Sequence, residues 1–113
     1  MSNILEQIIK DKKESLIFVK RQNSLEMIAK KIKEQNCFLN FKQTIEENQN
    51  VSLIAEIKKA SPSAGILIKD FNHLDIAKTY IDNGATCLSV LTEEKYFLGK
   101  LDFISDIKKK YQI

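Results

Sequence analysis

The sequence has few of the residues that mark a metal site, a disulfide framework or a membrane segment. It holds two cysteines and one histidine in 113 residues. Cys37 and Cys87 lie far apart and share no metal-ligand spacing, so we expect two buried, reduced thiols and neither a disulfide nor a metal site. The longest apolar run, Leu16 to Val19, is far shorter than the ~18 residues that span a bilayer. Because the first twenty residues mix acids and bases and contain no readable signal peptide, we expect a cytoplasmic protein without membrane contact.

The sequence also lacks a concentration of charge of one sign. The net charge is +3, and the basic residues are spread among acidic ones. Nucleic-acid binding usually needs a concentrated basic face with stacking aromatics. The run Lys108 to Lys110 is explained by the preference of cations for the last turn of a helix. We therefore predict no nucleic-acid partner.

All three glycines and the single proline lie in the second half, so the first half has no strong helix breaker. Apolar residues recur there at helical spacing. Asn3 with Glu6, and Asn23 with Glu26, are typical of helix starts with a capping side chain and an acid three residues later. We predict two or three amphipathic helices in residues 1–50.

The second half alternates strand and helix. Residues 51–57 and 86–91 are short apolar stretches suited to buried parallel strands. Helical spacing follows each stretch, first between a capping Asn72 and Gly84 and then over residues 101–111. This order predicts parallel strands joined by right-handed crossovers, an α/β fold. Ligands of such folds bind where the loops leave the carboxyl ends of the strands.

Two βα units are too few to close a barrel, which takes about 250 residues. A chain of 113 residues buries one modest core, and two strands alone leave the sheet edges unpaired. We therefore expect residues 1–50 to be a helical extension. Residues 51–113 are expected to be the first two βα units of a larger domain, truncated before the third strand.

Two motifs carry a resemblance to a known family. "LIAEIKKASPSAG" (53–65) and "GATCLSVLTEEKYFLGKLDFI" (84–104) resemble the first two strands and loops of indole-3-glycerol-phosphate synthase. "ILEQIIKDKKESL" (4–16) and "FKQTI" (41–45) are similar to the helical extension of that family. The resemblance implies a partial (β/α)8 TIM barrel and a lyase of tryptophan biosynthesis. The family closes an indole ring on 1-(2-carboxyphenylamino)-1-deoxyribulose 5-phosphate, with loss of carbon dioxide and water and without a cofactor.

The resemblance also implies site residues. In the family pattern E-x-K-x-x-S-P-S, the glutamate and lysine are matched by Glu56 and Lys58 and the serines by Ser61 and Ser63. Lys58 is implied to face the substrate, where it either anchors an anion or donates a proton. Glu56, on the same strand face, is implied to orient it and to take part in catalysis. Ser61 is implied to bind an anionic group, and Phe97 to lie against the aromatic ring of the substrate.

Some positions match the family less closely. Glu93 falls on the family's "LTE", with its role left open. His73 stands where the family usually has proline, and we expect a surface residue there. The family's principal general acid, on the third strand, and its phosphate-binding loops have no counterpart in these residues. We therefore expect this chain to be inactive alone.

Three alternatives stay open. The motif residues can instead be a surface ion pair, turn formers and a loop-packing phenylalanine. The chain can belong to another phosphate-binding TIM-barrel enzyme, or be a non-catalytic remnant or assembly module. The predicted partners are a small phosphorylated anion and either a second chain that supplies the rest of the barrel or a second copy paired at the open sheet edge.

Overall fold

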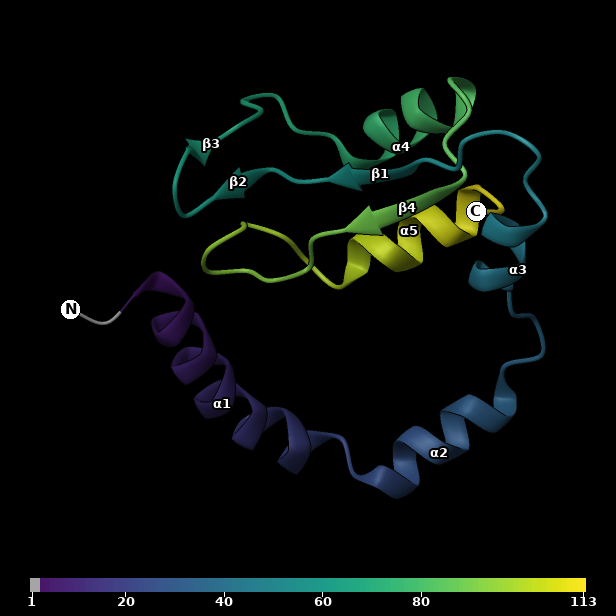
Figure 1. The fold of residues 1–113 in the computed structure, drawn as a ribbon. Helices are drawn as coiled ribbons and strands as arrows, with labels where there is room; N and C mark the ends of the chain where they lie inside the picture. The colour runs from purple at the N-terminus through teal and green to yellow at the C-terminus, as the bar shows by residue number, and fades with distance from the viewer. Residues whose placement is uncertain (1–2) are drawn as a thin grey trace. The chain divides into compact units, whose positions relative to one another are not determined.

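The computed structural model describes residues 3–113, which form two compact units, one ending at Phe38 and one running from Leu39 to Ile113. The first unit holds two helices, and the second holds a small parallel sheet with its helices (Figure 1).

The first unit consists of α1 (Ile4–Gln22) and α2 (Leu25–Glu34), and neither helix has a buried residue. The predicted start of α1 is confirmed, because Asn3 Oδ1 accepts a hydrogen bond of 2.8 Å from the Glu6 backbone N–H. This bond satisfies one of the N–H groups that the first turn leaves without a helical acceptor. Both helices therefore begin from local capping chemistry and not from burial.

The predicted start of α2 at Asn23 is wrong by one residue. Ser24 is the capping residue, and its Oγ accepts the Met27 backbone N–H at 3.2 Å. Asn23 instead closes α1, where its backbone N–H and its side-chain amide both donate to the Val19 carbonyl. Asparagine serves either end of a helix, and the adjacent serine supplies the same oxygen acceptor one residue later.

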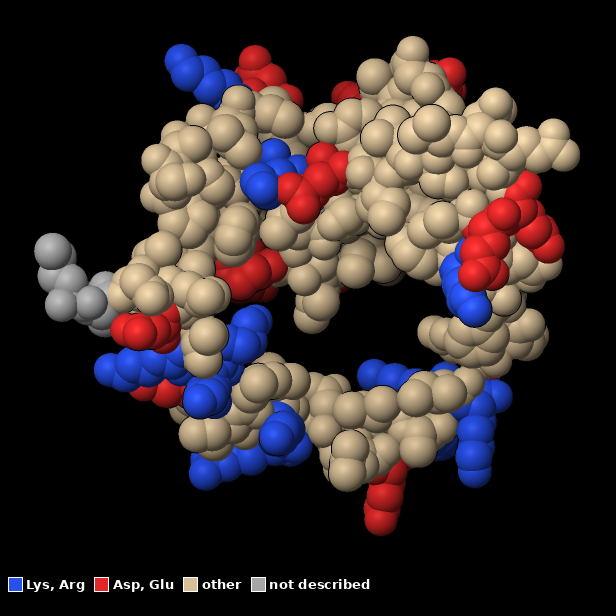
Figure 2. Space-filling view, viewed as in Figure 1, with Lys and Arg blue, Asp and Glu red and all other residues tan. Residues whose placement is uncertain are grey.

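Charge is distributed unevenly between the two units. Residues 39–113 contain equal numbers of basic and acidic side chains, so the whole net charge of +3 lies in residues 1–38. Lysine and arginine side chains crowd α1 and α2 in Figure 2, whereas both signs are mixed over the second unit. The sheet unit therefore has no net charge, and its local charge interactions come from individual ion pairs.

The second unit contains seven elements. They are α3 (Phe41–Glu46), β1 (Ile54–Ile57), β2 (Ala60–Ser61), β3 (Gly65–Ile66), α4 (His73–Asp82), β4 (Cys87–Val90) and α5 (Asp102–Lys110). β1 and β4 pair in parallel, from Ile54 opposite Cys87 to Ile57 opposite Val90. The predicted α/β alternation with parallel strands is confirmed, and α4 is the crossover between them.

The core lies on one face of this sheet. Ile57 is 1% exposed and packs with Ala77 of α4 and Ile107 of α5, which are equally well buried. Side chains alternate along β1, so Ala55 and Ile57 are buried while Ile54 and Glu56 are exposed. The small Ala77 side chain lets α4 come close to the strand. One face of the sheet is therefore packed by helices and the other is open.

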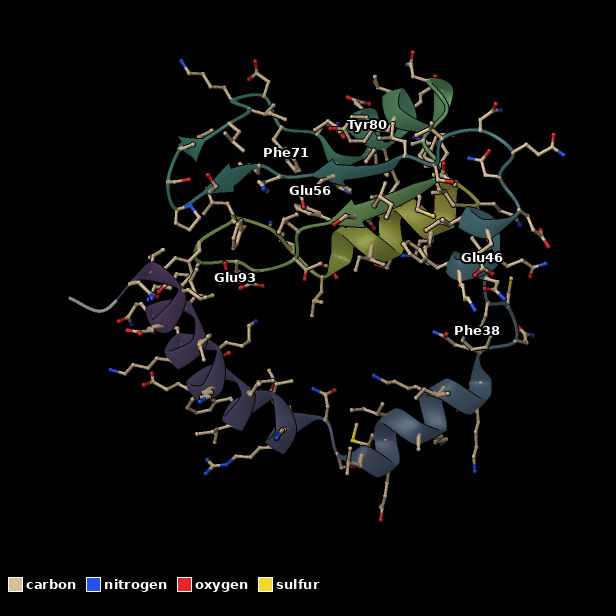
Figure 3. All side chains as sticks on the ribbon, in the orientation of Figure 1. Phe38, Glu46, Glu56, Phe71, Tyr80 and Glu93 are labelled. Carbon is tan, nitrogen blue, oxygen red and sulfur yellow. The ribbon has the colours of Figure 1, made fainter. Side chains whose placement is uncertain are left out.

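Polar contacts fix the two helices to the sheet and to each other. The Tyr80 hydroxyl of α4 donates to the Glu56 carbonyl at 3.0 Å (Figure 3). His73 lies 3.1 Å from the Asp106 carboxylate through Nε2 and stacks on Phe103 with ring centroids 4.3 Å apart. The expected surface position of His73 therefore holds only in part: its side chain is 18% exposed, because the first turn of α4 faces α5.

The two cysteines differ in environment, although both are free thiols. Cys87 is buried in β4 as expected, but Cys37 is exposed. Cys37 lies in an extended segment between α2 and α3, outside any packed layer. In residues 3–113, none of the helices has the length and apolarity needed to cross a membrane.

Removal of one methyl group should cost more stability on the buried face of β1 than on its exposed face. We expect Ile57→Val to lower the free energy of unfolding of the 113-residue chain by about 1 kcal/mol, because Ile57 is fully packed. The matched control Ile54→Val, at a half-exposed position on the same strand, should cost less than about 0.5 kcal/mol. Urea unfolding measures both, and equal losses would contradict the assignment of the core face.

Candidate active site

The candidate site lies at the carboxyl edge of the sheet, where two long loops begin. One loop follows β1 and contains the short antiparallel pair β2 and β3. The other follows β4 and leads to α5. Because β1 and β4 are parallel neighbours, both loops leave the same end of the sheet (Figure 1). All five predicted site residues lie on this edge or on these loops.

Glu56 and Lys58 form an ion pair at the end of β1. The Glu56 Oε1 atom lies 2.7 Å from Lys58 Nζ. Glu56 is on the open face of the strand, opposite the buried side chains of Ala55 and Ile57. The side chains are 46% and 31% exposed, respectively, so the attraction contributes at most about 1 kcal/mol to folding. The pair is therefore accessible to a ligand and is not required by the core.

Ser61, the last residue of β2, lies beside Ser63 in the tight turn that leads to β3. Their Oγ atoms are 3.4 Å apart, and Ser61 Oγ accepts the Ala64 backbone N–H at 3.2 Å. Gly65 completes the turn with φ +66°, a conformation that glycine adopts without steric cost. Pro62 fixes its own φ between the serines. The turn therefore presents two hydroxyl groups on a backbone with little freedom.

A single carboxylate organises the loop after β4. Glu93 Oε1 accepts the Lys95 backbone N–H at 2.9 Å. Glu93 Oε2 accepts those of Tyr96 and Phe97 at 2.6 and 3.1 Å. The Glu93 carbonyl also accepts the Gly99 N–H at 2.8 Å, which closes the loop. Glu93 (labelled in Figure 3) lies in this loop. It thus bonds to the backbone on both sides of Phe97.

Close packing of the backbone closes the same loop. A Cβ atom built on Gly99 would lie 2.1 Å from the Leu91 carbonyl oxygen, a distance that no side chain can occupy. The preceding residue, Leu98, has φ +53°, an uncommon value for a residue other than glycine. The chain therefore turns back on the end of β4, and this crossing limits the positions that Phe97 can take.

The structure brings the predicted site residues together in three groups. Glu56 is paired with Lys58, Ser61 lies beside Ser63, and Phe97 is on the second loop. Sequence reasoning missed the part played by Glu93. The available signal was a glutamate at the start of a loop. A carboxylate there can accept the N–H groups of the residues two to four positions later, by the same chemistry that caps helix starts. Within residues 3–113, no cluster of three or more histidine, cysteine or acidic side chains is placed to hold a metal ion.

The sequence matches the family described as indole-3-glycerol phosphate synthase over residues 5–113. The chain belongs to this family. A synthase of that name from Clostridium acetobutylicum is 45% identical over 107 residues, and one from Aliarcobacter butzleri is 47% identical over 112. A third, from Legionella pneumophila, is 42% identical over 110 residues.

The indole-3-glycerol phosphate synthase family match covers nearly the whole chain but only part of the relatives. The three alignments include 94%, 93% and 97% of this chain and 40%, 41% and 42% of the respective relatives. The chain therefore spans about 40% of the length of the curated relatives that it matches. The resemblance inferred from the two loop motifs is confirmed.

The backbone crossing at Gly99 should not tolerate a side chain. We expect Gly99→Ala to lower the free energy of unfolding by at least about 2 kcal/mol, because the new methyl group would displace the Leu91 carbonyl. Gly65→Ala is the matched control: it has open space around it but a positive φ, and should cost about 1 kcal/mol. A Gly99→Ala chain as stable as the Gly65→Ala chain in urea would show that the loop relaxes freely.

Proposed function

We propose that these residues form the first part of an indole-3-glycerol phosphate synthase active site. The complete protein would close the indole ring on 1-(2-carboxyphenylamino)-1-deoxyribulose 5-phosphate, with release of one carbon dioxide and one water. Family membership supports the reaction. The observation that carries the proposal is the Glu56–Lys58 pair, 2.7 Å apart on the open face of β1 and accessible to a ligand.

Lys58 and Glu56 are proposed to act on the reacting part of the substrate. Ring closure needs a cation near the anionic groups and an acid near the ketone oxygen, and an ammonium group serves either purpose. Lys58 directly follows the strand, and the Glu56 carboxylate orients its ammonium group. A long lysine side chain otherwise has several rotatable bonds, so this pairing reduces the entropy lost when substrate binds.

Ser61, Ser63 and Phe97 are proposed to bind the substrate. Because Ser61 Oγ already accepts the Ala64 N–H, its own hydroxyl proton is directed to another acceptor, either Ser63 or a bound anion. Phe97 offers an apolar ring that suits the anthranilate-derived ring of the substrate. No cofactor is needed for these roles, since the reaction forms one carbon–carbon bond and releases carbon dioxide and water from a single molecule through proton transfers.

The open surfaces of the sheet support the proposal of a partial (β/α)8 barrel. β1 and β4 pair only with each other in the described part of the chain. Ile54 is half exposed on the face away from α4 and α5. We propose that further strands complete the sheet, so that this face becomes the interior of the barrel. Residues 1–50 would then be the helical extension and 51–113 the first two βα units.

The rest of the barrel is proposed to come from the remainder of a synthase sequence. A chimaera that joins this chain to the remaining part of the Clostridium acetobutylicum relative provides it. We expect the chimaera to be active and the 113-residue chain alone to be inactive. In the chain alone the sheet face that carries Glu56 is open to water, which weakens every charge interaction in the site.

Substitution of the ion pair should remove activity without removing the fold. In the chimaera, we expect Glu56→Gln and Lys58→Met each to lower kcat at least ~100-fold, because proton transfer or charge stabilisation is lost. The free energy of unfolding should change by less than about 1 kcal/mol, since the pair is partly exposed. The rate of carbon dioxide release measures kcat, and unfolding in urea measures the stability.

The matched control for this test is Lys69→Met, which removes an exposed lysine from the same loop and should leave kcat unchanged. Full activity of the Lys58→Met chimaera would reject the proposed role of Lys58. Parallel loss of stability and activity would instead mean that the pair is structural.

Barrel completion has its own test at Ile54. In the 113-residue chain Ile54→Ser should change the free energy of unfolding by less than about 1 kcal/mol, because the side chain is half exposed. In the chimaera the same change should cost about 2–4 kcal/mol, because the side chain would then be buried in the barrel. Similar small losses in both proteins, or self-association of the chimaera through its sheet edge, would contradict barrel completion.

A further inference from the structure

The Glu93 carboxylate has an unusual set of partners for a loop residue. It accepts three backbone N–H groups, from Lys95, Tyr96 and Phe97, at 2.6 to 3.1 Å. Hydrogen bonds to an ionised acceptor are stronger than neutral ones. The Glu93 side chain is therefore engaged with its own loop, and its oxygens face the backbone rather than the space around it.

The last of these bonds is made by Phe97 itself. Glu93 Oε2 holds the Phe97 N–H at 3.1 Å, while the Glu93 carbonyl holds the Gly99 N–H two residues later. One residue thus fixes the backbone before and after the phenylalanine. Leu98, between these two bonds, has a positive φ. This unfavourable backbone conformation persists only where surrounding contacts hold it, as these two bonds do.

We infer that Glu93 is a positioning residue that sets where the Phe97 ring meets the substrate. The inference rests on the proposed function, because it takes Phe97 as the contact of the substrate's aromatic ring. Glu93 itself does not touch the substrate and transfers no proton. It acts through the backbone of the loop.

This role predicts a specific kinetic effect. An aromatic contact is made in the ground state and in the transition state alike, so its loss raises KM and leaves kcat nearly unchanged. Glu93→Gln is the sharpest variant, because it is isosteric and places an amide N–H₂ against backbone N–H donors. A variant that only loses folded protein would lower the apparent kcat and leave KM unchanged.

The test is a double-substitution cycle in the active chimaera. We expect Glu93→Gln to raise KM about tenfold, within the range of effects that small displacements of a binding group produce. Phe97→Ala should raise KM to a similar extent. In the Phe97→Ala background, Glu93→Gln should raise KM less than about twofold, because the group that it positions is already gone. The neighbouring Glu94→Gln, at an exposed position, is the matched control and should change neither constant.

Amide hydrogen exchange of the same proteins gives a readout independent of catalysis. The N–H groups of Lys95, Tyr96 and Phe97 should together exchange roughly tenfold faster in Glu93→Gln than in the wild type, since one of their two acceptor oxygens becomes an N–H₂ donor and the other loses its charge. Unchanged exchange at these three groups would overturn the inference.

The outcomes also separate this inference from the proposed function. If the wild-type chimaera is active, two results would overturn the inference alone. One is a KM that Glu93→Gln does not change. The other is a double variant whose rise in KM equals the product of the rises in the two single variants. A wild-type chimaera without synthase activity would overturn the proposed function, and with it the effect on substrate that is assigned to Glu93.

Discussion

The second unit depends on the packing of one strand residue against two helices. Ile57 is buried between Ala77 of α4 and Ile107 of α5, and this contact joins the crossover helix, the following helix and β1 in one core. With α4 held on that face, β4 returns parallel to β1. Parallel strands bring their following loops to the same edge. The site therefore owes its location to a hydrophobic contact that it does not include.

The two-residue period of β1 places its packed side chains on one face and the candidate site side chain on the other. Ala55 and Ile57 face the helices, and Ile54 and Glu56 face the other way. A register slip of one residue would bury the Glu56 carboxylate among the helices and expose Ile57. Burial of an unpaired carboxylate is costly, so the correct register is favoured from both faces. The same alternation that stabilises the strand thus directs the Glu56 side chain to the open face.

Features decided by neighbouring residues were predictable from the sequence. The cap at Asn72, which accepts the Leu74 and Asp75 N–H groups, is one. The α/β order is another, since it follows from the change of apolar period near Val51. The error at Asn23 came from the same local chemistry, because an asparagine and a serine in succession both fit a cap and only the register of the helices selects one.

Features decided by distant contacts were not predictable. His73 became partly buried because α5, about thirty residues later in the sequence, places Asp106 and Phe103 beside it. The pairing of β2 with β3 involves two residues from each strand, too few to produce a readable alternation. The candidate site residues were predicted from resemblance, whereas the contacts of the Glu93 carboxylate required knowledge of where its own loop folds back.

The two loops of the candidate site are held by different means, and this difference bears on how each contributes. Lys58 directly follows a paired strand, so its backbone is held by the sheet, and its ammonium group pairs with the Glu56 carboxylate. Phe97 is held by a loop whose shape depends on one carboxylate and one close backbone crossing. Catalysis by charge requires a preorganised geometry, and displacement of a ring contact weakens substrate binding. Under the proposed function, the sheet would therefore support the group that acts in the transition state, and the Glu93 loop would support the group that binds the substrate.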